Sequence, residues 1–413
     1  MQTYRELFRV PEFRPLFAAM SMQVAAGTLS GLALGTLVYT RTGSPLLSAI
    51  AMFGASFMQV VGAMTLLSAA DRVPPRFALS AVAVLFCAGS LALAAPGMPI
   101  AAMLAVLLCQ GLVNSVTGGV RWGLLGEILP EGGYLLGRSV MNMSVGVMQI
   151  TGFALGGVLV ATGVSPRLAL LGSAGLHLAA ALCLRLGLTR RAPRATGRPS
   201  VRQTWRSNAT LWSSRPRRAV YLSLWVPNGL IVGCEALFVP YAPDAAGVLF
   251  VAGAFGMLAG DMTAGRFLPA RRRAAFITPF RLLLAVPYLI FVLAPALPVA
   301  VVAVVLASAG FGAGLLLQER LLALTPESMR GHALGLHSSG MLTMQAVGAT
   351  VAGLIAQHTG PGTAMTVLAA ASVLVTLALT PALTRPLPAT DATGSGRPPR
   401  VRTDAAEPAA AAT

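Results

Sequence analysis

Stretches of about 20 apolar residues recur along the whole chain, separated by short clusters of Arg, Pro or Gly. A helix needs roughly 20 apolar residues to cross the hydrocarbon core of a bilayer. Of the 413 residues, 55% are hydrophobic and only 10% are charged, whereas a soluble domain carries about 25% charged residues. The sequence therefore predicts an all-α membrane protein. The first stretch is too long for a cleavable signal peptide and is expected to remain as a helix.

The apolar stretches form two sets of six. In the first half we expect transmembrane helices over residues 16–40, 45–68, 77–95, 98–120, 138–162 and 165–187. In the second half we expect them over 219–241, 244–264, 276–294, 297–320, 332–357 and 361–383. The predicted domains are a six-helix bundle over 1–188, a cytoplasmic linker over 189–218, a second bundle over 219–384, and a disordered tail over 385–413.

The net charge of +17 is distributed along the chain in a way that fits a membrane protein. A nucleic-acid-binding protein would gather its basic residues in one patch. Here the arginines fall in alternate loops, as the positive-inside rule requires, and only Arg41 and Arg167 lie on the opposite side. We therefore expect no nucleic-acid partner. Both termini are predicted to be cytoplasmic, with the protein spanning a bacterial inner (plasma) membrane several times.

The predicted linker has an unusual composition, with nine arginines between Thr189 and Arg218 together with Trp205 and Trp212. Such a mixture suits a short amphipathic segment on an anionic membrane surface. A solvated flexible loop is an equally good interpretation of the same residues.

The two halves also repeat one another in sequence. The motif Met-Gln-x-x-Gly-x-x-x-x-Gly occurs twice, offset by 196 residues, at Met148, Gln149, Gly152 and Gly157 and again at Met344, Gln345, Gly348 and Gly353. Pro130-Glu131 and Pro326-Glu327 have the same offset. A common offset favours a duplicated six-helix unit, and internal repeats of this kind are typical of transporters.

Several short motifs resemble the major facilitator superfamily. Phe13-Arg14, the Leu37-Val38-Tyr39 end of the first helix, and Thr42-Gly43-Ser44-Pro45 look like the branch that contains macrolide-efflux proteins and the enterobactin exporter. The resemblance covers nearly the whole chain, from Phe13 to Leu383. It implies two pseudo-symmetric six-helix bundles, the major facilitator fold, rocking about a central cavity.

Candidate gating residues follow from the same resemblance. The loop from Leu67 to Arg76 is similar to the superfamily signature between helices two and three. Asp71, Arg72 and Arg76 match the signature. Prolines stand where the signature has a glycine and a basic residue. An Asp at a helix end can interact with the positive N-terminus of a neighbouring helix, and the alternative is a charge that only marks the membrane boundary. Asp261 and Arg266, at the end of the eighth helix, are secondary gating candidates.

Two further superfamily signatures are only partly present. In helix four, Gln110-Gly111 aligns with the signature Arg-x-x-Gln-Gly, but Leu107 stands where the Arg would be. In helix five, the residues from Gly152 to Gly157 match part of the antiporter signature, and close helix packing is the favoured explanation of these glycines.

One carboxylate lies far inside an apolar stretch. Glu235 falls well within the seventh predicted helix, and an intramembrane charge is costly enough to suggest a function. It is a candidate for binding a cationic substrate or a proton, and a hydrogen-bonded structural acid is the alternative. Neutral polar residues inside predicted helices are further candidate substrate contacts, or else interhelical hydrogen bonds: Gln23, Gln110, Asn114, Asn142, Gln149, Asn228, His337 and Gln345.

No pattern in the sequence indicates an enzyme or a bound cofactor. There is no phosphate-binding GxxxxGK[ST] loop, no HExxH motif and no CxxC pair, and the four cysteines lie inside apolar stretches. We therefore expect no cofactor and no metal. The resemblance favours an exporter of small amphipathic or lipophilic compounds that functions as a monomer, with protons as the candidate coupling ion. An importer or facilitator of another solute, and a non-transporting sensor, are the alternatives.

Overall fold

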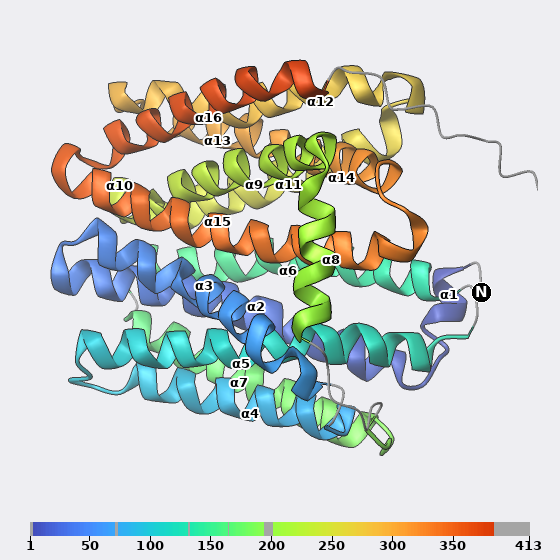
Figure 1. Cartoon of the computed structure of the whole chain (residues 1–413). Helices are drawn as coiled ribbons and strands as arrows, with labels where there is room; N and C mark the ends of the chain where they lie inside the picture. The colour runs from blue at the N-terminus through green and yellow to red at the C-terminus, as the bar shows by residue number, and fades with distance from the viewer. Residues whose placement is uncertain (1–2, 71–72, 131–132, 164, 194–200, 384–413) are drawn as a thin grey trace, which may run out of the picture.

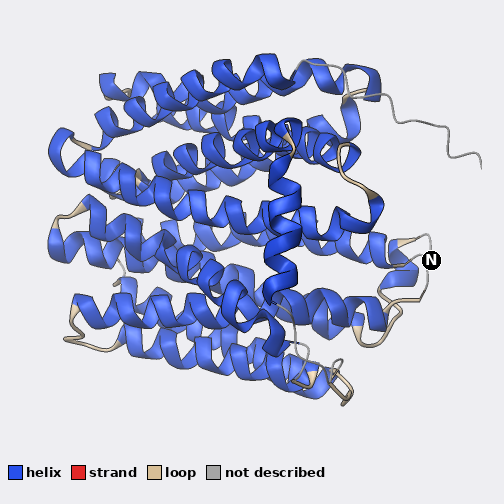
Figure 2. Cartoon of the chain, viewed as in Figure 1, coloured by secondary structure: helices blue, strands red, loops and turns tan. Residues whose placement is uncertain are grey.

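The computed structural model describes residues 3–70, 73–130, 133–163, 165–193 and 201–383. Throughout these residues the regular elements are all helices, as Figure 2 shows. Twelve membrane spans can be recognised in them by length and hydropathy. The predicted all-α fold with two sets of six spans is confirmed.

The first half contains seven helices, six of which are long enough to span a bilayer. They are α1 Tyr4–Leu7, α2 Phe13–Thr42, α3 Pro45–Ala70, α4 Pro75–Ala94, α5 Ile100–Ile128, α6 Tyr134–Ala161 and α7 Pro166–Gly187. Helix α8, Val201–Ser213, lies in the linker.

The second half has the same number of spans, but several of them are interrupted. They are formed by α9 Arg215–Ala236 with α10 Phe238–Tyr241; α11 Ala246–Met262 with a π-helical turn Thr263–Phe267; α12 Ala270–Ala285 with a 3₁₀ segment Val286–Leu293; α13 Leu297–Ala309 with α14 Ala313–Ala323, joined by a 3₁₀ turn Gly310–Gly312; α15 Arg330–Thr359, after a 3₁₀ turn Glu327–Met329; and α16 Pro361–Leu383. The interruption before α14 accompanies a close approach, because a Cβ on Gly310 would lie 2.3 Å from the backbone N of Leu284.

One boundary in the first half differs from the prediction. The fourth span was expected to end at residue 120, but α5 continues to Ile128. The predicted span ended just before Arg121, yet the apolar residues after this charge continue the helix. Arg121 therefore lies inside the helix and not at its end.

The helices gather into two groups, with α2–α7 in the lower half of Figure 1 and α9–α16 in the upper half. We call them the N-bundle and the C-bundle. Between the bundles, α3 packs against α15 and α6 packs against α11. Helix α8 runs across the other helices, from the level of the N-bundle to that of the C-bundle.

The two bundles touch closely at one end of the molecule. We call the end that carries α1 and the starts of α2 and α9 the linker side, and the opposite end the distal side. On the distal side a Cβ on Gly157 of α6 would lie 2.7 Å from the Cα of Gly247 of α11. A Cβ on Gly353 of α15 would lie 2.6 Å from the Cα of Leu46 of α3. Only glycine permits helices to approach this closely.

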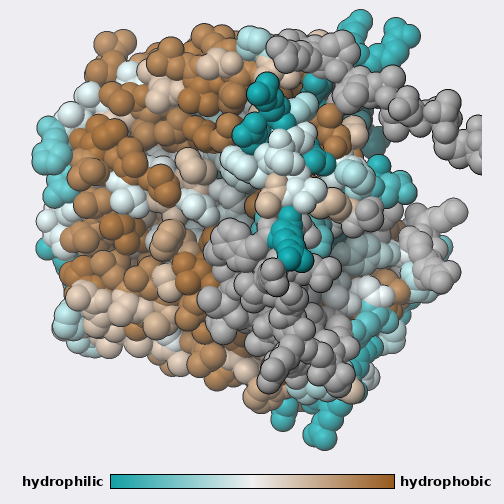
Figure 3. All heavy atoms as spheres, in the orientation of Figure 1, coloured by the Kyte–Doolittle hydropathy of each residue, from teal (hydrophilic) through white to brown (hydrophobic). Residues whose placement is uncertain are grey.

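The flank of the molecule is apolar, as expected for a surface in contact with lipid. In Figure 3 hydrophobic residues cover much of the visible flank, and hydrophilic residues gather towards its ends. The spanning helices carry large exposed apolar side chains, among them Leu85, Val158, Leu182, Val302 and Leu374. In water a patch of this extent would favour aggregation, whereas in a bilayer it faces acyl chains.

Candidate functional site

The candidate site is built on helices α2 and α5, which correspond to the first and fourth spans. Helix α2 packs mainly against α7, α6 and α3, while α5 packs mainly against α3 and α4. The two helices are joined by a hydrogen bond of 3.4 Å from a guanidinium nitrogen of Arg121 to Oε1 of Gln23. Both side chains are half-buried. The pair therefore bridges two helices whose backbones make little direct contact.

The other faces of α2 are occupied by neighbouring helices. The Ala26 carbonyl accepts a hydrogen bond of 3.0 Å from Ser173 of α7. A Cβ on Gly152 of α6 would come within 2.8 Å of the Ala25 carbonyl oxygen, and a Cβ on Gly35 would meet Met52 of α3. These contacts involve faces of α2 other than the one that carries Gln23.

Glycines beside the pair mark unfilled space. Gly27 and Gly31 follow Gln23 at helical spacing on the same face of α2, and a Cβ built on either would meet no atom of the described chain within 4 Å. The same holds for Gly118, which lies one turn before Arg121 on α5. Open space therefore lies beside Gly27 and Gly31 on α2 and beside Gly118 on α5, within one or two helical turns of the paired side chains.

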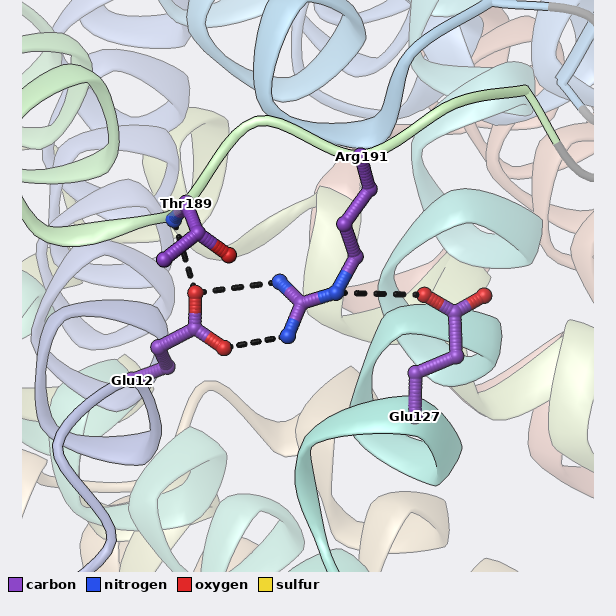
Figure 4. A network of polar contacts seen from close by, with 4 residues as sticks. All are labelled: Glu12, Glu127, Thr189 and Arg191. Carbon is purple, nitrogen blue, oxygen red and sulfur yellow. Dashed lines mark hydrogen bonds and ion pairs between the residues drawn. The ribbon is translucent and has the colours of Figure 1, made fainter.

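An ion-pair network joins three segments at the linker side of the N-bundle (Figure 4). Arg191, just after α7, forms a two-bonded ion pair with Glu12 before α2 and also lies 3.6 Å from a carboxylate oxygen of Glu127 on α5. Glu12 additionally accepts a hydrogen bond of 2.7 Å from the backbone N–H of Thr189. The Arg191 guanidinium is the main reason why the pKa of Glu12 falls to about 2 from its ordinary value of 4.5, against the opposing effect of burial.

In the C-bundle two predicted polar residues contact one another. Gln345 of α15 donates a hydrogen bond of 3.0 Å to Oδ1 of Asn228 on α9, and both are half-buried. Nearer the linker side the Trp225 indole N–H donates to the backbone carbonyl of His337 at 3.1 Å. The His337 side chain is buried, and its Nδ1 has no hydrogen-bond partner among the described residues. Amide and indole groups thus connect α9 and α15.

Glu235 lies in the interior of the C-bundle. Its side chain is only 8% exposed, and its Oε1 has no hydrogen-bond partner among the described residues. Gly253 of α11 faces it: a Cβ there would lie 3.9 Å from Oε1 of Glu235 and 3.4 Å from Oγ of Ser308. The Ser308 hydroxyl is also buried and has no partner in the described chain. Glu235 and Ser308 thus both lie beside Gly253 inside an apolar core.

The remaining predicted contacts are spread through the N-bundle. Gln110 donates a hydrogen bond of 3.3 Å to the backbone carbonyl of Phe86, so its amide is turned towards α4. Asn114 is half-buried on α5, seven residues before Arg121 and on the same side of the helix. On α6, Asn142 is exposed and Gln149 is half-buried.

Two of the predicted gating residues, Asp71 and Arg72, lie outside the described residues. Arg76 is half-buried in the first turn of α4, and its Nε has no partner in the described chain. Asp261 and Arg266 are exposed near the end of the eighth span. Neither makes an ion pair with another described residue, whereas nearby Arg273 contacts Glu319 at 3.0 Å.

Sequence reasoning missed two buried titratable groups in addition to Arg121. Arg281 of α12 is 1% exposed, and none of its three guanidinium nitrogens has a hydrogen-bond partner among the described residues. His177 of α7 is buried 5.3 Å from the Phe86 ring. Both residues fell inside predicted helices, so the cost of an intramembrane charge was the available signal. Among the described residues, no group of three or more His, Cys, Asp or Glu side chains could hold a metal ion.

No family model and no curated protein matches the chain. Its fold, however, is shared with solved transporter structures. The nucleoside transporter NupG matches with a TM-score of 0.73 and 12% identity, over 91% of this chain and 100% of its own. A POT family transporter in complex with a thioalcohol-conjugated peptide matches with a TM-score of 0.70 and 14% identity, over 90% and 96%. A bacterial homologue of the human lysosomal transporter Spinster matches with a TM-score of 0.63 and 15% identity, over 93% of this chain and 95% of its own.

Identities this low establish the fold alone. The chain has the two-bundle, twelve-helix fold of the major facilitator transporters, as the sequence predicted. The narrower resemblance to the macrolide-efflux and enterobactin-exporter branch stays a prediction.

Proposed function

We propose that this chain is a secondary active transporter that exports small amphipathic or lipophilic compounds by alternating access, with protons as the coupling ion. The observation that carries the proposal is the Arg121–Gln23 pair beside unfilled space within the membrane spans. Polar side chains at membrane depth are costly and normally line a pathway for solutes. The fold shared with nucleoside and POT family transporters supports the same conclusion.

Alternating access requires the bundles to separate at one end while they meet at the other. The glycine contacts of Gly157 with Gly247 and of Gly353 with Leu46 close the distal side in this structure. In the proposed cycle these contacts open to release the compound, and the linker side closes instead. Asp71, Arg72, Arg76, Asp261 and Arg266 are proposed to act as gating residues there.

Glu235 is the proposed proton site. An ionised carboxylate in a dry core is strongly unfavourable, and protonation removes that charge. Its burial and its unpartnered Oε1 fit a carboxyl group that changes its protonation state during the cycle. The amide pair Asn228–Gln345 is the proposed substrate contact of the C-bundle; Gln110, Asn114, Asn142, Gln149 and His337 remain further candidates.

We further propose that the protein works as a monomer in the plasma membrane of a bacterium, with both termini in the cytoplasm. An even number of spans returns the chain to the side on which it begins. The proposed units are the bundles at 1–188 and 219–384, joined by the linker at 189–218 and followed by the tail at 385–413.

The test is transport in inverted membrane vesicles that contain the full chain. A panel of lipophilic dyes and antibiotics is offered with and without an imposed pH gradient, to wild type and to Glu235→Gln. The matched control is Glu319→Gln, because Glu319 undergoes the same change but is 56% exposed and pairs with Arg273 on the surface.

We expect gradient-driven accumulation in wild type and in the control, and its loss in Glu235→Gln at equal protein level. Accumulation without any dependence on the pH gradient would contradict proton coupling. Transport of no compound by wild type would contradict export, and uptake in right-side-out vesicles would then favour the importer alternative.

A further inference from the structure

Arg121 is the deepest formal charge of the N-bundle. Each other Arg, Asp or Glu in the described helices α2–α7 lies within four residues of a helix end. Arg121 lies seven residues before Ile128, the last residue of α5, which is about 10 Å along the axis at 1.5 Å per residue. Its depth therefore requires a different explanation from that of the boundary arginines.

The side chain of Arg121 also points inward. An arginine near a helix end normally extends its guanidinium towards the headgroups. The partner of Arg121 is instead Gln23, ten residues into α2 and so about 15 Å from the start of that helix. The guanidinium therefore reaches further into the membrane, towards the space bordered by Gly27 and Gly118.

No acidic side chain balances this charge within the described chain. Arg121 makes no ion pair there, and its one hydrogen bond is to the neutral amide of Gln23. The acidic residues nearest the linker side of these helices, Glu12 and Glu127, are engaged by Arg191. A guanidinium carries five N–H donors in a planar fork that fits a carboxylate, so most of its donors remain available for a ligand.

The second half of the chain has no cation at the position that corresponds to Arg121. The 196-residue offset relates Gly118 of α5 to Gly314 of α14, both beside open space. The same offset relates Arg121 to Leu317, which is apolar and 1% exposed. The repeat has therefore kept the open glycine and not the cation at this position.

We propose that Arg121 and Gln23 bind a single carboxylate group of the transported compound, which makes amphipathic organic monoanions the substrate class. The guanidinium donates two hydrogen bonds to the carboxylate, and the Gln23 amide N–H₂ supplies a third donor. The apolar part of the ligand occupies the space along Gly27, Gly31 and Gly118. This assignment rests on the proposed transport function for its physiological meaning, but binding tests it separately.

The experiment measures equilibrium binding to the purified full-length protein in detergent. Three ligands share one apolar body and differ in the head group: a carboxylate, its primary amide and the corresponding amine. The proteins are wild type, Arg121→Gln, Arg121→Lys and the control Arg41→Gln. Arg41 is at the distal end of α2, where it bonds to the Met98 carbonyl, so its loss removes the same charge elsewhere.

Wild type should bind the carboxylate at least about tenfold more tightly than the amide, since hydrogen bonds to charged groups contribute that much or more. Arg121→Gln should lower carboxylate affinity by roughly tenfold to a hundredfold and leave amide affinity unchanged. Arg121→Lys should retain part of the preference, because it keeps the charge and loses the fork. Arg41→Gln should bind as wild type does. If Arg121→Gln fails to fold, the proposal is still tested by the Arg121→Lys variant and by the three ligands on wild type.

Equal binding of the carboxylate and the amide by wild type would overturn the proposal, as would a carboxylate preference that persists in Arg121→Gln. Competition by chloride at equal concentration would also overturn it, since the site would then hold any small anion. If no compound is transported in the vesicle assay but the carboxylate preference still depends on Arg121, the proposed transport function is wrong and the proposed carboxylate site stands.

Discussion

The two bundles share one backbone plan and differ in what they do with buried charge. In the N-bundle the deep charge, Arg121, is half-buried next to unfilled space, and the spanning helices run without interruption. In the C-bundle the deep charges Arg281 and Glu235 are 1% and 8% exposed, and several spans are broken by 3₁₀ or π turns.

This difference separates two meanings of an intramembrane charge. A charge beside open space can be balanced by a solute that comes and goes. A charge sealed in the core has to be balanced by the protein, by a proton or by a trapped ion. On the proposed function, the open charge of the N-bundle would serve substrate recognition, and the sealed charges of the C-bundle would hold a proton or ion away from the substrate.

The largest expected effect compares the duplicated glycines Gly348 and Gly152. A Cβ on Gly348 would lie 1.9 Å from the backbone oxygen of Gly229, which cannot move without separating α15 from α9. A Cβ on Gly152 would meet mainly the Thr28 hydroxyl, a side chain that can rotate, although the Ala25 carbonyl is 2.8 Å away. We expect Gly348→Ala to lower stability by about 3 kcal/mol and Gly152→Ala by about 1 kcal/mol. Thermal unfolding in detergent measures both, and equal losses would mean that the two bundles are packed alike.

The second prediction concerns Arg281. It is fully buried with no partner among the described residues, so replacing it by an apolar side chain of similar length should relieve an uncompensated charge. We expect Arg281→Met to raise stability by about 2 kcal/mol, whereas Arg121→Met should change it by less than about 1 kcal/mol because Arg121 is half-buried. Melting of both variants at low and high chloride gives the comparison. A loss of stability in Arg281→Met would show that an ion or water compensates the charge, which sharpens the contrast with the open site.

The sequence was sufficient for the fold and insufficient for the site. Hydropathy placed all twelve spans, and the 196-residue offset identified the repeat, because both depend on composition and spacing alone. The depth of a polar side chain in the membrane and the direction in which it points depend on where its helix ends and on what packs beside it. Arg121 was placed just beyond the end of the fourth predicted span, whereas α5 continues past it. Gln110 was a candidate either for a substrate contact or for an interhelical hydrogen bond, and its amide bonds to α4. Helical spacing puts residues on one face but does not say which face is open.

The third prediction concerns the attachment of α8, the helix over residues 201–213. Trp212 stacks on Trp225 of α9, with ring centres 5.6 Å apart and planes 7° from parallel, and Leu211 beside it is fully buried. The aromatic contact attaches this end of the linker to the C-bundle. We expect Trp212→Ala to lower the free energy of unfolding by about 1 kcal/mol. Protease should also cleave the linker faster in this variant. Unchanged proteolysis would indicate that α8 is held elsewhere.

The smallest expected effect tests the linker's attachment to the N-bundle, which is ionic and therefore depends on pH. Hydrogen bonding to Arg191 holds the pKa of Glu12 at about 2, below its ordinary value of 4.5. Because the pKa is lowered in the folded state, the ionised carboxylate stabilises the fold above pH 4.5, and this contribution is lost as the pH falls from 4.5 towards 2. Glu12→Gln should therefore be less stable than wild type at pH 7, by less than about 1 kcal/mol for a partly exposed pair, and should become equal to it below pH 2. The aromatic attachment contains no group that titrates in this range, so the deficit of Trp212→Ala should stay constant over the same pH series. A Glu12→Gln deficit that also stayed constant would mean that the ion pair contributes through packing, and the two attachments would then be of the same kind.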